Sequence, residues 1–220
     1  MSPRSHNLVF LGPPGAGKGT QAARWALRHG LAHISTGDLL RENLKDQTSV
    51  GMMAQDFMDR GVLVPDDVVC QMVRDRLEHQ DTEPGFILDG FPRTVGQADA
   101  LARDLARRHR PLTRVVSFAV REEDLVVRLA GRLTCGRCGR VFHQKSNAPK
   151  AQGVCDDCDG ELFSRSDDSE ETVLARLATY REETAPLLSW YRDRDLLTDI
   201  DASQSIEAVE GALERALECQ

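Results

Sequence analysis

The sequence predicts an α/β fold of three layers, in which a central parallel β-sheet of about five strands has helices on both faces. Apolar runs of strand length recur along the 220 residues, and longer segments with helical periodicity separate them. This alternation indicates a parallel sheet, because crossovers between parallel strands usually lie as helices on its faces. The apolar runs are 8–11, 86–88, 115–120 and 196–200, with a further short strand expected around 31–35.

The first apolar run leads straight into a glycine-rich loop at 12–20, with the sequence GPPGAGKGT. Glycines adopt backbone conformations that other residues avoid, so several N–H groups of such a loop can turn inward and bind an anion. Lys18 adds a positive charge, and the helix expected to follow directs the positive end of its dipole to the same place. The spacing is that of a Walker A loop, except that Gly19 stands between the lysine and Thr20. The loop therefore predicts a phosphate site.

Two segments are predicted as insertions into this core. Residues 35–64 are expected to form short helices that end before Pro65, which suits the start of the next helix around Asp66. Residues 131–168 have several glycines and few long apolar runs, so they cannot form a hydrophobic core unaided. The predicted organisation is one chain with a core of 1–34, 65–130 and 169–220, and insertions at 35–64 and 131–168.

The segment that returns to the core is predicted as a helix over 169–192. Asp168 is expected to cap it, with Glu171 three residues later as in a capping box. Pro186 lies inside this helix and predicts a kink or a break.

Composition limits the partners of the chain. The net charge of −7 argues against nucleic acid, because proteins that bind a phosphate backbone concentrate positive charge. No apolar run approaches the roughly 18 residues of a membrane span, and the first residues lack the apolar centre of a signal peptide. We expect a cytoplasmic protein, a monomer, with no membrane partner.

Four of the six cysteines form two CxxC pairs with 16 residues between the pairs. This is the spacing of a zinc ribbon, and four thiolates complete a tetrahedral structural site. His143 is therefore interpreted as a bystander, and Gly136 and Gly139 as residues that permit tight turns. The predicted zinc ligands are Cys135, Cys138, Cys155 and Cys158, whereas Cys70, semi-buried on a helix, and Cys219, near the end of the chain, are taken as plain residues.

Asp89 ends the apolar strand expected at 85–89, GFILD, and is followed by Gly-Phe-Pro-Arg-Thr. A carboxylate at the end of a strand beside a phosphate loop can orient water on Mg²⁺. The alternative is a helix cap or a surface aspartate at a turn.

Arginines recur at motif positions, and their planar forks suit phosphate oxygens. Phosphoryl transfer needs positive charge around the moving group and no covalent nucleophile. Each arginine taken alone could instead be solvated surface charge. The five in question are Arg41, Arg93, Arg132, Arg165 and Arg176.

The glycine loop resembles the phosphate loop of nucleoside monophosphate kinases, adenylate kinases above all. The resemblance extends over about residues 7–201 and implies the reaction MgATP + AMP ⇌ MgADP + ADP, with a zinc-bearing lid at 131–168. Such an activity serves adenine nucleotide homeostasis. The further matching motifs are STGD at 35–38, DGFPRT at 89–94, GR at 131–132, SRSDD at 164–168 and EETV at 170–173.

The resemblance also implies a role for each matching position. Gln204 stands where several adenylate kinases have a lysine. Asp89 would hold Mg²⁺ through water. The implied catalytic residues are Lys18, Arg93, Arg132, Arg165 and Arg176. The implied ATP site comprises Gly15, Ala16, Gly17, Lys18, Gly19, Thr20, Arg132, Val141, Phe142 and Gln204. The implied AMP site comprises Thr36, Arg41, Val62, Leu63, Val64, Gly90, Phe91, Pro92, Arg93, Gln97, Arg165 and Arg176.

Two other functions stay open from the sequence. A kinase of UMP, CMP or GMP would differ at the base pocket, where Thr36 and Gln97 favour adenine only through the resemblance. A P-loop core with a zinc ribbon could instead bind RNA or a protein, and would then need basic and aromatic residues on the ribbon. The ribbon segment offers Arg137, Arg140, Lys145 and Lys150, but only Phe142 and Phe163 as aromatics.

Overall fold

A five-stranded parallel sheet forms the centre of the computed structural model, which describes residues 6–218. The strand order is β2-β3-β1-β4-β8, and every pairing is parallel. The predicted sheet is thus confirmed, including the short strand after the first helix. The strands are β1 (His6–Leu11), β2 (Ala32–Ser35), β3 (Gly85–Asp89), β4 (Arg114–Ala119) and β8 (Leu197–Asp201).

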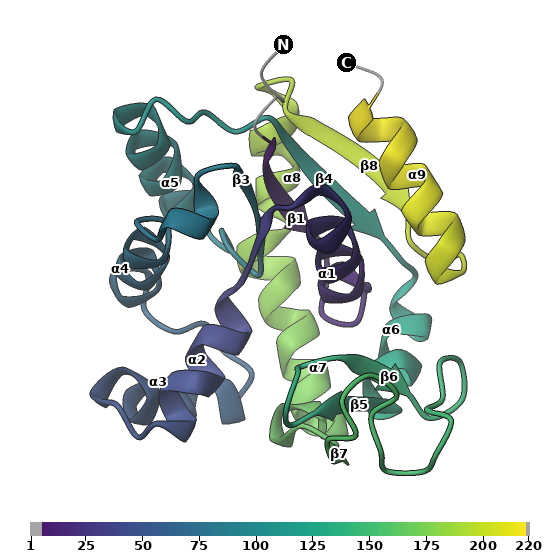
Figure 1. The fold of residues 1–220 in the computed structure, drawn as a ribbon. Helices are drawn as coiled ribbons and strands as arrows, with labels where there is room; N and C mark the ends of the chain where they lie inside the picture. The colour runs from purple at the N-terminus through teal and green to yellow at the C-terminus, as the bar shows by residue number, and fades with distance from the viewer. Residues whose placement is uncertain (1–5, 219–220) are drawn as a thin grey trace.

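Helices cover both faces of this sheet (Figure 1). Alternate residues of β1 point to opposite faces, so Phe10 packs in one apolar cluster with Trp25 while Val9 packs in the other with Leu101. Both faces are buried, as is usual for a parallel sheet. One cluster includes α4 (Asp66–Arg76), α5 (Val95–Arg107) and α8 (Pro186–Arg192); the other includes α1 (Lys18–His29), α6 (Glu122–Ala130), α7 (Glu170–Thr179) and α9 (Ile206–Glu218).

Two units lie outside the sheet, beyond the carboxyl ends of its strands (Figure 1). One is the helical pair α2 (Thr36–Lys45) and α3 (Ser49–Asp59), in which Thr48 caps α3 through the N–H of Gly51. The other is a three-stranded antiparallel sheet of order β6-β5-β7. Its strands are β5 (Arg132–Cys135), β6 (Val141–His143) and β7 (Leu162–Phe163).

The segment predicted as one helix over 169–192 is divided. After α7 the backbone forms a π-helical stretch, Tyr180–Thr184, and α8 begins at Pro186, so the predicted break at this proline is confirmed. The predicted cap is wrong, because the Ser169 hydroxyl accepts the N–H of Thr172. The buried carboxylate of Asp168 is held by arginines instead. Short 3₁₀ turns at Gln80–Thr82 and Ser166–Asp168 complete the described elements.

Cys70 is half-buried on α4, as predicted, whereas Cys219 lies outside the described residues. Over residues 6–218, no helix combines the length and apolar character needed to cross a membrane.

Candidate functional site

A cleft of about 1690 Å³ lies at the carboxyl ends of the core strands. The glycine loop, the α2–α3 pair and the small antiparallel sheet all contribute to its walls. A pocket for one drug-sized ligand has about 300–1,000 Å³, so this cleft has room for two such molecules. Of the residues predicted to bind nucleotide, all but Phe91 line it; the Phe91 side chain is buried in the core.

The glycine loop makes the floor of the cleft. Gly12, Gly15 and Gly17 have positive φ angles of 148°, 85° and 90°, which residues with a Cβ rarely adopt. Helix α1 begins directly after Gly17, so the free N–H groups of its first turn lie beside the loop. This is the anion-binding arrangement that the sequence predicts.

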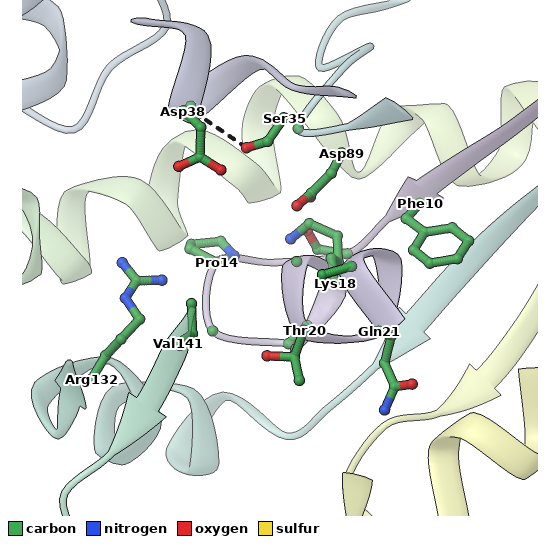
Figure 2. Close-up of a pocket in the computed structure, with 18 of the residues that line it drawn as sticks. Phe10, Pro14, Lys18, Thr20, Gln21, Ser35, Asp38, Asp89, Arg132 and Val141 are labelled. Carbon is green, nitrogen blue, oxygen red and sulfur yellow. Dashed lines mark hydrogen bonds between the residues drawn. The ribbon is translucent and has the colours of Figure 1, made fainter. Parts of the chain in front are cut away.

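Lys18 lies over this loop. Its Nζ donates to the carbonyl oxygens of Gly12 and Pro13 at 2.8 and 2.9 Å, and its ammonium group points toward Asp89 (Figure 2). Burial lowers the pKa of Lys18 to about 8, and neighbouring arginines add to the effect, while Asp89 opposes it. A bound phosphate would replace the carbonyls as the partner of a charge that is costly to bury.

Asp89, at the end of β3, faces both the lysine and His33 on β2, whose Nε2 lies 3.6 Å from Oδ2. Burial by itself would raise the pKa of Asp89, but His33 and Lys18 outweigh burial, and the pKa lies below its ordinary value. The carboxylate is therefore charged at neutral pH and can accept hydrogen bonds from water around a cation. The sequence reasoning missed His33, which also lines the cleft.

The arginines around the cleft are held by acidic side chains. Arg132 donates two hydrogen bonds to the Asp168 carboxylate, in a bidentate arrangement. The same carboxylate also accepts from Arg176 Nη1 at 3.2 Å. Arg176 Nη1 lies 2.9 Å from Asp167 Oδ2. Asp167 and Asp168 sit in the SRSDD motif, but the sequence did not indicate that they pair with these arginines. The carboxylates offset the mutual repulsion of the cations.

A second group joins the two walls. Asp38 on α2 pairs with Arg41 Nη2 at 2.5 Å and lies 3.9 Å from Arg165 Nη2, while Arg165 Nε donates to Thr134 of β5 at 2.9 Å. Burial lowers the pKa of Arg165 and of Arg93 to about 10 in each case, so both stay charged at neutral pH. The structure thus brings all five predicted arginines to one cleft.

The predicted AMP residues line the wall between β3, α5 and the α2–α3 pair. Thr36 Oγ1 donates to the carbonyl oxygen of Gly90 at 2.8 Å, and Arg93 Nε donates to the same oxygen at 2.9 Å. Gln97 is buried, and its Oε1 accepts the backbone N–H of Arg93 at 2.7 Å. The segment 62–64 and Pro92 also line this wall.

The predicted ATP residues lie on the side of β5, β6 and the loop after β8. Gln204 is exposed, and its Nε2 donates to Asp201 Oδ2 at 3.0 Å. Arg128, which the sequence reasoning missed, donates to the carbonyl oxygen of Ala202 at 2.9 Å and also lines the cleft. The sequence carried no signal for it, because Arg128 lies on α6 and its contact is with the distant segment after β8.

The four predicted zinc ligands lie together. Their Sγ atoms are all within 4.8 Å of one another, with pairs at 3.5 and 3.6 Å. Sulfurs bound tetrahedrally at about 2.3 Å from zinc would be about 3.8 Å apart, so the cluster fits this ion. The His143 ring does not belong to the cluster, because Nδ1 accepts the N–H groups of Lys145 and Ser146.

Each CxxC pair is followed directly by a residue with left-handed backbone, Gly139 at φ 74° and Asp159 at φ 56°. Gly136 has no positive φ angle. In the first CxxC turn, therefore, Gly139 has the left-handed conformation and Gly136 does not. Gly160 was missed: a Cβ there would lie 2.8 Å from the sulfur of Cys135. Only glycine fits at that position.

Comparison with known proteins agrees with this geometry. The family model described as adenylate kinase matches residues 10–196. The chain is 49% identical over 211 residues to the adenylate kinase of Carboxydothermus hydrogenoformans, covering 96% of this chain and 99% of that one. It is 48% identical over 212 residues to the adenylate kinase of Archaeoglobus fulgidus, covering 96% and 98%. Because these matches span the core sheet, the cleft and the cysteine cluster alike, the chain belongs to the adenylate kinase family.

Proposed function

We propose that this chain binds MgATP and AMP together in the cleft and transfers the terminal phosphoryl group between them, giving two ADP. It is a phosphotransferase by its family. The observation that carries the proposal is the convergence of Lys18 and five arginines on one cleft large enough for two nucleotides. Interconversion of the three adenine nucleotides would keep their ratios balanced in the cell.

In this proposal the cations are the catalytic residues. Lys18, Arg93, Arg132, Arg165 and Arg176 would surround the phosphates and spread the charge that develops during transfer. Each already has a carbonyl or carboxylate partner that a phosphate oxygen can replace. No covalent nucleophile is required.

Magnesium fits the same place. The charged carboxylate of Asp89 would hold it through water, and Thr20 in the first turn of α1, which also lines the cleft, would lie near the ion. When bound, Mg²⁺ neutralises the phosphate charge of ATP.

Binding roles follow the two walls of the cleft. The loop 15–20, Arg132, Val141, Phe142 and Gln204 are proposed to contact ATP. Thr36, Arg41, the segment 62–64, the segment 90–93, Gln97, Arg165 and Arg176 are proposed to contact AMP, with Phe91 contributing only its backbone.

The direct test supplies the purified protein with MgATP and each of AMP, CMP, UMP and GMP, and follows ADP formation. The expected result is rapid turnover with AMP and almost none with the others. Turnover with CMP, UMP or GMP in preference to AMP would replace the proposed function by another nucleotide kinase. A gel-shift assay with single-stranded RNA, expected to show no complex, tests the binding-module alternative.

We also propose that residues 35–64 and 131–168 close over the nucleotides. Arg41 comes from the first segment and Arg132 and Arg165 from the second, whereas Lys18 and Arg93 belong to the core. Closure would assemble these charges and exclude water, which could otherwise hydrolyse ATP. A bisubstrate analogue, two adenosines joined by a phosphate chain, should reduce the radius of gyration in small-angle X-ray scattering. An unchanged radius with the analogue bound would contradict closure.

The pKa of Lys18 predicts proton uptake on ATP binding. Phosphates favour the charged ammonium, so binding raises a pKa that is about 8 in the free protein. At pH 8 we expect uptake of about half a proton per MgATP, and weaker ATP binding as the pH rises further. Calorimetric titrations at pH 8 in Tris and HEPES, whose ionisation enthalpies differ, measure the uptake. Lys18→Arg should abolish it, and an equal uptake in that variant would assign the proton to another group.

For the cysteine cluster we propose structural Zn²⁺. Four thiolates leave no open position on the ion for water or substrate, so its contribution would be to order the lid, here residues 131–168. We further propose that the protein acts as a monomer in the cytoplasm.

A further inference from the structure

We infer that Asp66 is a positioning residue that fixes the orientation of the Gln97 amide and thereby makes the base pocket selective for adenine. The inference rests on the proposed function, in which Gln97 contacts AMP. Asp66 is the first residue of α4, while Gln97 lies in the first turn of α5, 31 residues later. The two helices pack side by side (Figure 1).

Both oxygens of the Asp66 carboxylate are engaged. Oδ1 accepts from Gln97 Nε2 at 2.7 Å, and Oδ2 accepts from the Thr94 hydroxyl at 2.7 Å. The Thr94 oxygen in turn accepts the backbone N–H of Gln97 at 3.1 Å. A Cβ added to Gly96 would lie 3.2 Å from Oδ2, so the carboxylate sits close against the backbone of α5. The aspartate therefore has little freedom to turn away.

The opposite end of the amide is fixed by the backbone. Gln97 Oε1 accepts the N–H of Arg93 at 2.7 Å. A backbone N–H can only donate, and a charged carboxylate can only accept. Turning the amide by 180° would place its NH₂ group against an N–H and its oxygen against a carboxylate. Because Gln97 is buried, water could not compensate for either mismatch.

This fixed amide still has hydrogen bonds to offer. A glutamine amide has two acceptor positions on oxygen and two N–H donors, and the contacts with Arg93 and Asp66 use one of each. The remaining acceptor and donor match adenine, which presents its 6-amino group as a donor and an adjacent ring nitrogen as an acceptor. Hypoxanthine and guanine carry an oxygen at position 6 and would meet the amide oxygen with an acceptor. A freely rotating glutamine would adapt to either kind of base.

Inosine monophosphate is the sharpest probe, because its hypoxanthine base replaces the 6-amino group of AMP with oxygen and adds no 2-amino group. Asp66→Ala should lower the ratio of kcat/KM for AMP to that for inosine monophosphate by at least about tenfold. Most of the change should be a higher KM for AMP, with kcat at saturating AMP within about threefold of the wild type and the KM for ATP unchanged.

Asp67→Ala is the matched control. Asp67 is exposed in the same first turn of α4 and supplies similar charge to the helix N-terminus, so a purely electrostatic effect on α4 would appear in both variants. The control should leave the ratio unchanged. Asp66→Asn keeps the shape of the side chain and covers the case in which Asp66→Ala does not fold; as a neutral acceptor it should lower the ratio by at least about threefold.

Folded variants of Asp66 with a wild-type ratio would overturn the inference, as would an equal loss of selectivity in Asp67→Ala. Failure of the proposed function is a separate result, because the wild type itself would then not prefer AMP. A lower unfolding temperature alone would indicate only a structural role for the contacts between α4 and α5.

Discussion

Lys18→Ala and Arg93→Ala are each expected to lower kcat/KM by at least about 100-fold while the fold stays intact. Both side chains are partly buried cations that line the cleft beside the glycine loop and β3, and both are held by backbone carbonyls that a phosphate can replace. Removing a preorganised charge from the place where negative charge develops costs about 3 kcal/mol of transition-state stabilisation. Steady-state kinetics with MgATP and AMP measure the loss.

Matched controls separate this effect from a general change in charge. Lys45 and Arg107 are exposed at the ends of α2 and α5 and do not line the cleft. Their alanine variants should keep kcat/KM within about twofold, as is usual for surface positions. Near-normal activity of Lys18→Ala or Arg93→Ala, with folding shown by circular dichroism, would remove that residue from the proposed catalytic set.

The parts of the fold that local sequence determines were predictable. Apolar runs of three to six residues became strands because a parallel sheet hides both faces. Pro186 interrupted its helix because it has no N–H to donate. The loop at 12–20 was equally clear, since three of its glycines, Gly12, Gly15 and Gly17, have positive φ angles that favour glycine. These features depend on residues close together in the chain.

Contacts between distant segments were not predictable from the same signals. Asp168 was expected to cap a helix, but the arginines of β5 and α7 compete for its carboxylate, and Ser169 takes the capping position. A capping bond from an exposed serine costs little to form, whereas leaving a buried carboxylate without a cation would cost several kcal/mol. His33 was missed for a similar reason, because its relation to Asp89 arises only when two strands pair.

Phe91 shows that membership of a motif does not determine where a side chain points. It stands inside the segment 90–93, whose other members line the cleft, yet its side chain faces the core formed with α4 and α5. A motif records which residues occur together, whereas the direction of each side chain depends on backbone geometry that the motif does not contain.

The second large effect is expected from the cysteine cluster. Removing zinc with a chelator, or changing Cys135 and Cys138 to serine, should lower the unfolding temperature by about 10 °C. Over residues 6–218, the buried apolar cluster of the lid consists of Cys135, Phe142, Cys155 and Leu162, so two of its four members are proposed metal ligands. A loss of about 4 kcal/mol of folding free energy corresponds to a shift of about 8–16 °C in a chain of this size. Differential scanning calorimetry measures the shift, with Cys70→Ser as the control outside the cluster.

Activity in the cold should largely survive this change, because the proposed chemistry uses Lys18, arginines and Mg²⁺. Four thiolates close the coordination shell of zinc, so the ion offers nothing to a substrate. Amide hydrogen exchange should show where structural order is lost: the amides of β5–β7 should exchange faster, and those of the core sheet should exchange at an unchanged rate. If the metal-free protein keeps its full thermal stability, the cysteines are not a structural site. If it stays folded with a protected lid yet has no turnover in the cold, zinc takes part in catalysis, contrary to the chemistry of its four ligands.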